Sequence, residues 1–229
     1  MRRGGVIALA AVGVLWPALL VAGRWPQWWE WIAPELTPMT WLQSVILVVA
    51  GAGALLVAVV LRLAGVPAVG RRIWWLLGAG FGALAVDERF ALHERVRDGW
   101  LAPRGVEIPF LPWVAAGDFL VLGIAAIGLL LLPQVWAAVS PDPGARAALV
   151  VAVSLALVAV GVDSIDPSTW TVQQERFQQT AEEVVELWCG LALLTSVALR
   201  LLGLLQSHVP SERASAAQAE RTTAGHPEG

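Results

Sequence analysis

Six apolar stretches follow one another along the 229-residue chain, and they constrain its fold more than any other feature. A helix needs about 20 predominantly apolar residues to cross a bilayer core about 30 Å thick, and each stretch has about that length. The sequence therefore predicts an all-α, polytopic transmembrane helix bundle of about six spans within residues 1–206. The stretches are Val6–Gly23, Trp41–Leu63, Ile73–Leu92, Phe119–Val139, Ala145–Val162 and Val184–Leu205.

The composition agrees with this prediction. Of the residues, 57% are hydrophobic and only 14% are charged, whereas a soluble domain keeps about 25% charged residues to cover its surface. With 13 tryptophans and no tyrosine, an interfacial aromatic belt has to be made of tryptophan, and the segment from Arg24 to Trp41 fits the headgroup level. The first stretch also fits a cleaved signal peptide, because Arg2 and Arg3 precede it, but Pro17 and the length favour a retained span.

Arginines set the expected orientation, since positively charged loops stay in the cytoplasm. Their bias predicts that both ends of the chain face the cytoplasm of a bacterial inner membrane, N-in and C-in. Residues 207–229 lack apolar periodicity and are expected to form a disordered cytoplasmic tail. The arginines on the expected cytoplasmic side are Arg2, Arg3, Arg62, Arg71, Arg72, Arg146, Arg200 and Arg213, and those opposite are Arg24, Arg95, Arg97, Arg104 and Arg176.

The net charge and the cysteine content exclude several functions and structural features. A net charge of −3 gives no electrostatic basis for nucleic-acid binding. The single cysteine, Cys189, excludes an internal disulfide and a cysteine-based zinc cluster. Membrane lipid is the expected partner of most of the surface, with a homo-oligomer or a larger membrane complex left open.

Acidic residues near the apolar stretches gather at one expected side of the membrane, the outer one. An ionised side chain at mid-bilayer costs about 2.5–3.5 kcal/mol on insertion scales, so such residues usually have partners or a function. We therefore expect the acids to form a site where the outer ends of the spans meet. They are Asp87, Glu88, Glu94, Asp118, Asp163, Asp166, Glu182, Glu183 and Glu186.

Helical spacing sorts these residues into rows. On one straight helix Asp87, Glu94 and Asp98 share a face, while His93 lies about 120° away. Asp87 and His93 can therefore meet at one ion only if other helices complete two sub-sites or if the helix breaks near Phe90. A second row forms in the last span if its helix extends back beyond Thr180. It consists of Glu175, Gln179, Glu182 and Glu186, continued by Cys189.

Carboxylates with one imidazole are ligands that suit Mn, Fe or Zn, whereas all-oxygen sets suit Mg or Ca. The sequence thus predicts a divalent metal, and a spare carboxylate beside it as a general base. The Glu-x-x-His motif of di-metal helix bundles is absent. The expected ligands are Asp87, His93, Glu94, Asp163, Glu182 and Glu186, and the expected catalytic residues are Asp87, Glu88 and Glu94.

Ordinary structural roles remain open for several of these residues. Thr180-x-x-Glu183 has the pattern of a capping box at a helix start, and Asp166 before Pro167 has that of an N-cap. Asp118 can cap the fourth span in the same way, and Asp87 and Glu88 can pair with neighbouring arginines. Small residues at Gly51-x-Gly53 and Gly78-x-x-x-Gly82 predict close packing of the second and third spans.

The stretch from Asp87 to Glu94, Asp-Glu-Arg-Phe-Ala-Leu-His-Glu, is similar to a D-[DE]-x-F-x-x-H-E motif of small bacterial multi-pass membrane proteins of uncharacterised function. The run Glu182-Glu183-x-x-Glu186 resembles the acidic opening of the last span of those proteins. The resemblance implies a shared site at one membrane face, and it carries no known activity.

These patterns support three hypotheses of different classes. The first is a metal-binding membrane protein, and potentially a metal-dependent enzyme, that acts on a lipid-like or membrane-proximal substrate. The second is a small proton- or cation-coupled transporter, in which the carboxylates act as a relay. The third is a structural or assembly subunit whose charges bind a partner.

Overall fold

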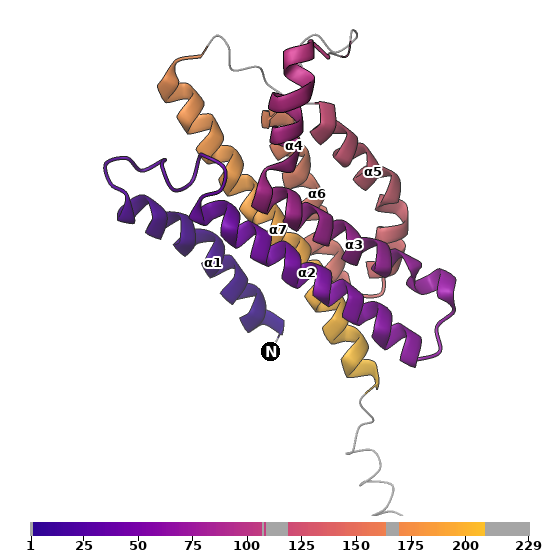
Figure 1. Ribbon diagram of the computed structural model, residues 1–229. Coiled ribbons are helices and arrows are strands. Elements are labelled where there is room, and N and C mark those ends of the chain that lie inside the picture. The colour runs from indigo at the N-terminus through magenta and orange to yellow at the C-terminus, as the bar shows by residue number, and fades with distance from the viewer. Residues whose placement is uncertain (1, 107, 109–118, 164–169, 209–229) are drawn as a thin grey trace, which may run out of the picture.

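The computed structural model of the chain is a bundle of helices (Figure 1), and it describes residues 2–106, 108, 119–163 and 170–208, without the side chains of Arg2 and Asp163. No strand occurs among these residues. The α-helices are α1 (Arg2–Gly23), α2 (Pro38–Leu63), α3 (Ala68–Phe90), α4 (Leu92–Val96), α5 (Phe119–Val139), α6 (Pro143–Asp163) and α7 (Val172–His208), and α4 continues into the short turns η1 (Arg97–Leu101) and η2 (Ala102–Arg104).

The predicted all-helical fold is confirmed for the described residues. Among these residues, five helices are long and apolar enough to cross a membrane, namely α1, α2, α5, α6 and α7. Large apolar side chains such as Ile127 and Leu130 are exposed on their outer faces, as lipid contact requires. The third predicted span falls on α3, which is not among the five, because Arg71 and Arg72 lie near its start and Asp87, Glu88 and Arg89 near its end. The expected tail lies mostly outside the described residues.

Helix α7 lies against α1, α2 and α6, and α3 runs beside α2 (Figure 1). Gly51 of α2 and Gly78 of α3 bring their two backbones close together, since a Cβ built on Gly51 would lie 3.3 Å from the carbonyl oxygen of Gly78. The predicted close packing of these helices is therefore correct at Gly51 and Gly78. Gly53, in contrast, faces Val197 of α7.

The start of α7 corrects one sequence interpretation. The helix begins at Val172, because Thr171 and Gln174 form the capping box: the backbone N–H of Thr171 donates to Gln174 Oε1 at 2.9 Å, and that of Gln174 to Thr171 Oγ1 at 3.3 Å. Thr180 instead lies inside the helix, where its hydroxyl donates to the carbonyl oxygen of Arg176. The capping box predicted at Thr180 and Glu183 is therefore wrong, and Glu183 is free for another role.

Candidate carboxylate site

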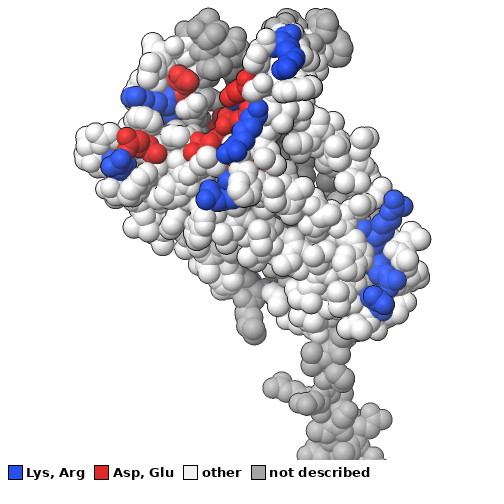
Figure 2. All heavy atoms as spheres, viewed as in Figure 1, with Lys and Arg blue, Asp and Glu red and all other residues white. Residues whose placement is uncertain are grey.

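Acidic side chains gather around a hollow at the upper end of the molecule, with several arginines among them, and a separate group of arginines lies at the opposite end, beside the turn between α2 and α3 (Figure 2). The hollow is a pocket of about 700 Å³ lined by residues of every helix except α1. The sequence-based expectation that the acids converge at one end is confirmed for the described residues. The acidic residues that line the pocket are Glu35, Asp87, Glu88, Glu94, Asp98, Glu175, Glu182, Glu183 and Glu186.

A break between α3 and α4 positions the first group. Ala91 adopts a left-handed conformation (φ 47°, ψ 49°) that ends α3 and redirects the chain. Asp87 stabilises the break, since its Oδ1 accepts the backbone N–H of His93 at 2.8 Å and its Oδ2 lies 2.9 Å from His93 Nδ1. The helix thus breaks next to Phe90, which is one of the two ways in which the sequence allowed Asp87 and His93 to meet.

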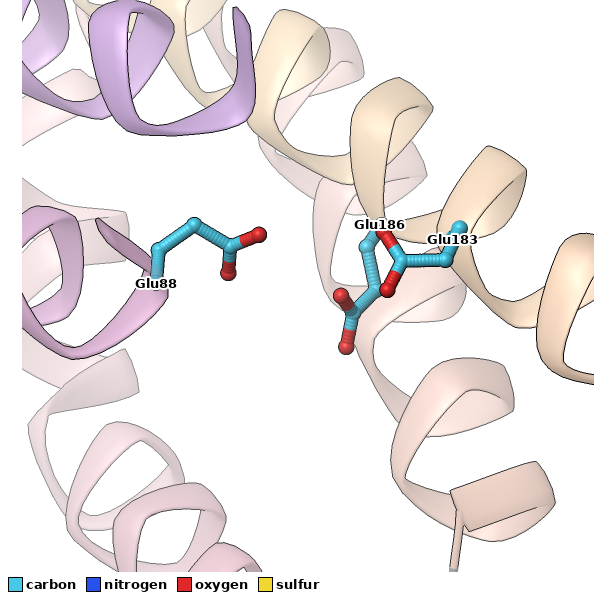
Figure 3. A group of neighbouring side chains, drawn as sticks. All are labelled: Glu88, Glu183 and Glu186. Atoms are coloured by element: carbon cyan, nitrogen blue, oxygen red, sulfur yellow. The ribbon is translucent and has the colours of Figure 1, made fainter. Parts of the chain in front are cut away.

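Three glutamates form the second group. Glu88 extends from α3 toward Glu183 and Glu186 of α7 (Figure 3), and one carboxylate oxygen of each residue lies within 4.8 Å of those of the other two. Glu183 is only 6% exposed, and its Oε2 has no hydrogen-bond partner among the described residues. Glu88 Oε1 is buried and unpartnered in the same sense. We refer to Glu88, Glu183 and Glu186 as the glutamate cluster.

Gln43 of α2 is bonded to the backbone of α7 at this cluster. Its side chain is 4% exposed and lines the pocket, and its Nε2 donates to the backbone carbonyl oxygen of Glu183 at 2.9 Å. Its Oε1 is also buried and finds no partner in the described part of the chain. Buried polar atoms are normally hydrogen-bonded, so oxygens left open in a pocket indicate a place for a ligand.

The other predicted ligands are engaged elsewhere or lie outside the described residues. Glu94 accepts a hydrogen bond from Arg97 at 2.9 Å, and Arg97 also donates to Asp98. Glu182 accepts from Gln178 at 2.8 Å. Asp163 is the last residue of α6, and its side chain is not described. The predicted set is thus divided, with only Glu186 in the cluster; Asp118 and Asp166 lie outside the described ranges.

Sequence reasoning missed Glu35 and Gln43 as site residues. Glu35 lies in the segment between α1 and α2, and it reaches the pocket only because that segment folds back over the bundle. Gln43 had a detectable signal, since it is a polar residue near the start of a long apolar helix. Glu183 was expected among the converging acids but not as a ligand, because its capping pattern offered a sufficient local explanation.

Two titratable groups that line the pocket, Glu35 and His93, have raised pKa values. Burial, together with the charges of Glu94 and Asp87, raises the pKa of Glu35 to about 7. The hydrogen bond to Asp87 raises the pKa of His93 above its ordinary value, and the Asp87 and Glu94 charges add to this effect against the opposing influence of burial. The pKa of Glu35 therefore lies near neutral pH, and that of His93 lies above its ordinary value.

Fold and site together define a helical membrane protein with a carboxylate-lined pocket. The chain belongs to the family described as "Domain of unknown function (DUF8692)", whose model matches residues 5–201. The match includes every residue of the pocket. No curated protein and no solved structure matches the chain.

Proposed function

We propose that this protein binds a divalent metal ion in the pocket and uses it as a membrane-embedded enzyme. In this proposal α3 is the sixth span, both ends of the chain face the cytoplasm, and the pocket opens to the outer face of a bacterial inner membrane. The arginines beside the α2–α3 turn, at the end of the bundle opposite the acids, support this orientation.

The glutamate cluster is the observation that carries the proposal. Metal–oxygen bonds of about 2.0–2.6 Å place ligand oxygens on opposite sides of an ion about 4–5 Å apart, which matches a cluster whose oxygens lie within 4.8 Å. Three carboxylates that lie this close together in a pocket repel one another unless a cation or protons balance their charge. Among Mn, Fe and Zn, an all-oxygen ligand set suits Mn²⁺ best, with Mg²⁺ and Ca²⁺ as competitors.

The Asp87–His93 pair adds a proton-transfer group to the same pocket. Asp87 fixes the ring of His93 through Nδ1, so Nε2 is the ring nitrogen that is left to exchange a proton with a ligand. A metal in the cluster would polarise a substrate oxygen or a water molecule, and the protonated His93 would act as a general acid. Apolar residues on α5 and α6 form the opposite wall of the pocket, which favours a lipid-like or membrane-proximal substrate.

A transport function has weaker support. A coupled transporter needs a polar path from the pocket to the opposite end of the bundle. The main buried cluster between them is apolar and includes Val57, Leu61, Trp74, Val139 and Leu149. The acids lie on one side of this cluster, which is the arrangement of a site and not of a relay.

Elemental analysis of protein purified in detergent without chelator tests the metal proposal. We expect near-stoichiometric metal in the parent and its loss in Glu88→Gln and Glu186→Gln. Glu175→Gln is the matched control, because Glu175 lines the same pocket from the same helix outside the cluster. Loss of metal in the control as well, or a parent that remains empty after reloading with Mn²⁺, would contradict the proposal.

The variants Asp87→Ala and His93→Ala locate the ion. An ion bound by Asp87 and His93, as the sequence predicted, is lost in both variants. An ion bound by the glutamate cluster is retained in both, although the break at Ala91 is weakened. Retention in these variants together with loss in Glu88→Gln therefore assigns the ion to the cluster.

A further inference from the structure

We infer that the ligand of this pocket, beyond any metal, is an amphiphile with a cationic head: an alkylammonium group on an apolar chain. The inference deepens the proposed function, since it names a substrate class for the same pocket and rests on that pocket being the place of action. It is carried by three features of the pocket, namely its charge, its two unlike walls and its open buried oxygen.

The charge of the pocket is one-sided. Nine of the described lining residues are acidic, against one arginine and one histidine. Arg97 is held by Glu94 and Asp98, and His93 by Asp87, so neither presents an unopposed positive charge. The undescribed segments 109–118 and 164–169 contain no arginine, lysine or histidine. A divalent ion balances only two of the carboxylates, so the pocket still attracts cations and repels anionic head groups.

The two walls of the pocket differ in polarity. The charged lining residues come mainly from α3, α4 and α7, whereas every lining residue of α5 and α6 is apolar. A volume of about 700 Å³ is far more than a bare ion occupies, and it falls in the range of small-molecule pockets, about 300–1,000 Å³. A ligand that fills both walls needs a polar head and an apolar body. The apolar wall consists of Val121, Ile124, Ala125, Ala156, Ala159 and Val160.

The open side-chain oxygen of Gln43 is a hydrogen-bond acceptor in the pocket. It is buried, has no partner among the described residues, and lies outside the glutamate cluster that would hold the metal. An ammonium group presents up to three N–H donors and a positive charge to this oxygen, whereas a phosphate presents mainly acceptors and negative charge. The acceptor therefore complements a cationic head and opposes an anionic one.

Calorimetric titration of the detergent-solubilised protein with octylammonium, octyl phosphate and ethylammonium tests the inference. We expect octylammonium to bind at least about tenfold more tightly than octyl phosphate, because of charge. We also expect it to bind at least about tenfold more tightly than ethylammonium, because only the longer chain reaches the apolar wall. Equal or tighter binding of octyl phosphate would overturn the assignment.

Two variants separate the pocket from adventitious partitioning into the micelle. Ala156→Leu fills the apolar wall and is expected to weaken octylammonium binding while leaving Mn²⁺ content unchanged. Ala147→Leu places the same side chain on an exposed part of α6 and is expected to change neither. Equal octylammonium affinity in both variants would show that the chain does not occupy the pocket.

The result is distinguishable from the outcome of the metal experiment. A preference for octyl phosphate in protein that carries stoichiometric Mn²⁺ overturns this inference and leaves the metal site standing. A metal-free protein that still selects octylammonium, and loses it in Ala156→Leu, overturns the metal site and leaves the cationic ligand as the function of the pocket.

Discussion

The two ends of the bundle differ in how completely their buried polar side chains are hydrogen-bonded. At the end away from the pocket, Ser196 donates to the carbonyl oxygen of Ala145 at 2.8 Å, and Asp142 caps α6 by accepting the N–H of Gly144 at 2.9 Å. At the pocket end, Gln43 and Glu183 are equally buried, yet each keeps an oxygen without a partner in the described structure. We call these regions the closed end and the pocket end.

This difference indicates where the chain has been shaped for stability and where for binding. A buried polar atom without a partner costs about 1–3 kcal/mol, so the pocket end is less stable than the same helices could make it. The closed end provides the compensating stability through apolar packing around Trp74, Val57 and Val139. Substitutions at the closed end should therefore change stability most, and those at the pocket end should change binding and pH dependence.

The largest effect is expected from Trp74→Ala at the closed end. Trp74 is 1% exposed within the apolar cluster, and removal of a buried tryptophan typically costs about 3–5 kcal/mol. The measurement is the thermal unfolding midpoint in detergent. The neighbouring Trp75 is 44% exposed, so Trp75→Ala serves as the control and should lower the midpoint much less. Similar losses in the two variants would mean that the closed end is not the stabilising part.

The second prediction concerns the break between α3 and α4. Asp87→Asn weakens the hydrogen bonds to the backbone N–H and ring of His93, and it should lower the free energy of unfolding by about 1–2 kcal/mol near pH 6. The pKa of His93 is raised in the folded protein, so the stability from its pairing is complete below its ordinary value of 6.5 and is lost as the pH rises through the raised value.

The deficit of Asp87→Asn should therefore be smaller at pH 9 than at pH 6, measured by thermal unfolding in the presence of a chelator. The charged groups that face His93 are Asp87, Glu94 and Glu35. Asp98→Asn is a suitable control, because Asp98 is exposed and contacts Arg97 but not His93. A deficit that is constant across this pH range would show that the pair does not contribute as a protonated histidine with a carboxylate.

In the third prediction the substitution stabilises the protein instead of destabilising it. The pKa of Glu35 is raised from 4.5 to about 7, so the folded protein holds this proton more tightly than the unfolded chain does, and stability falls as the pH rises from about 4.5 through 7. Glu35→Gln removes that loss. At about 1.4 kcal/mol per pKa unit the upper limit is about 3 kcal/mol, and solvent screening of a half-buried group reduces it to about 1 kcal/mol.

Glu35→Gln should consequently stabilise the metal-free protein at pH 8 relative to pH 5, as followed by its unfolding midpoint. Glu30→Gln is the control, since Glu30 lies in the same segment but pairs with Arg24 and does not line the pocket. A variant that is less stable than the parent at pH 8 would show that Glu35 makes a favourable contact that outweighs its burial.

The sequence predicted the fold through features that act locally. Apolar length and composition predict helices irrespective of their neighbours, and five of the six stretches lie on helices long and apolar enough to cross a membrane. The convergence of acids at one end also followed, because successive antiparallel helices return each second loop to the same side. These predictions needed no knowledge of side-chain contacts.

The site could be predicted only in part, because its members meet through geometry that no spacing encodes. The left-handed conformation of Ala91 moves His93 onto Asp87, and alanine carries no signal for such a break. The start of α7 at Val172 turns Glu183 from an expected cap into a buried group, which a competing capping pattern at Thr180 concealed. Glu35 enters from a segment without regular structure, whose course depends on the packing of the whole bundle.

The smallest expected effect tests how that segment is held over the pocket. The guanidinium carbon of Arg176 on α7 lies 4.0 Å from the centre of the Trp29 ring, which ties the α1–α2 segment to the helix that carries the glutamate cluster. Such a contact contributes about 0.5–1 kcal/mol at a partly exposed site. Arg176→Gln should therefore lower stability by about that amount, and Arg104→Gln should lower it less, because Arg104 stacks on Trp100 four residues away in its own turn.

A double-mutant cycle of Arg176→Gln and Trp29→Leu isolates the pairwise contribution of this contact. A coupling energy near zero would mean that Glu35 is positioned by the packing of Ile32 and Met39 against α7 and not by this contact.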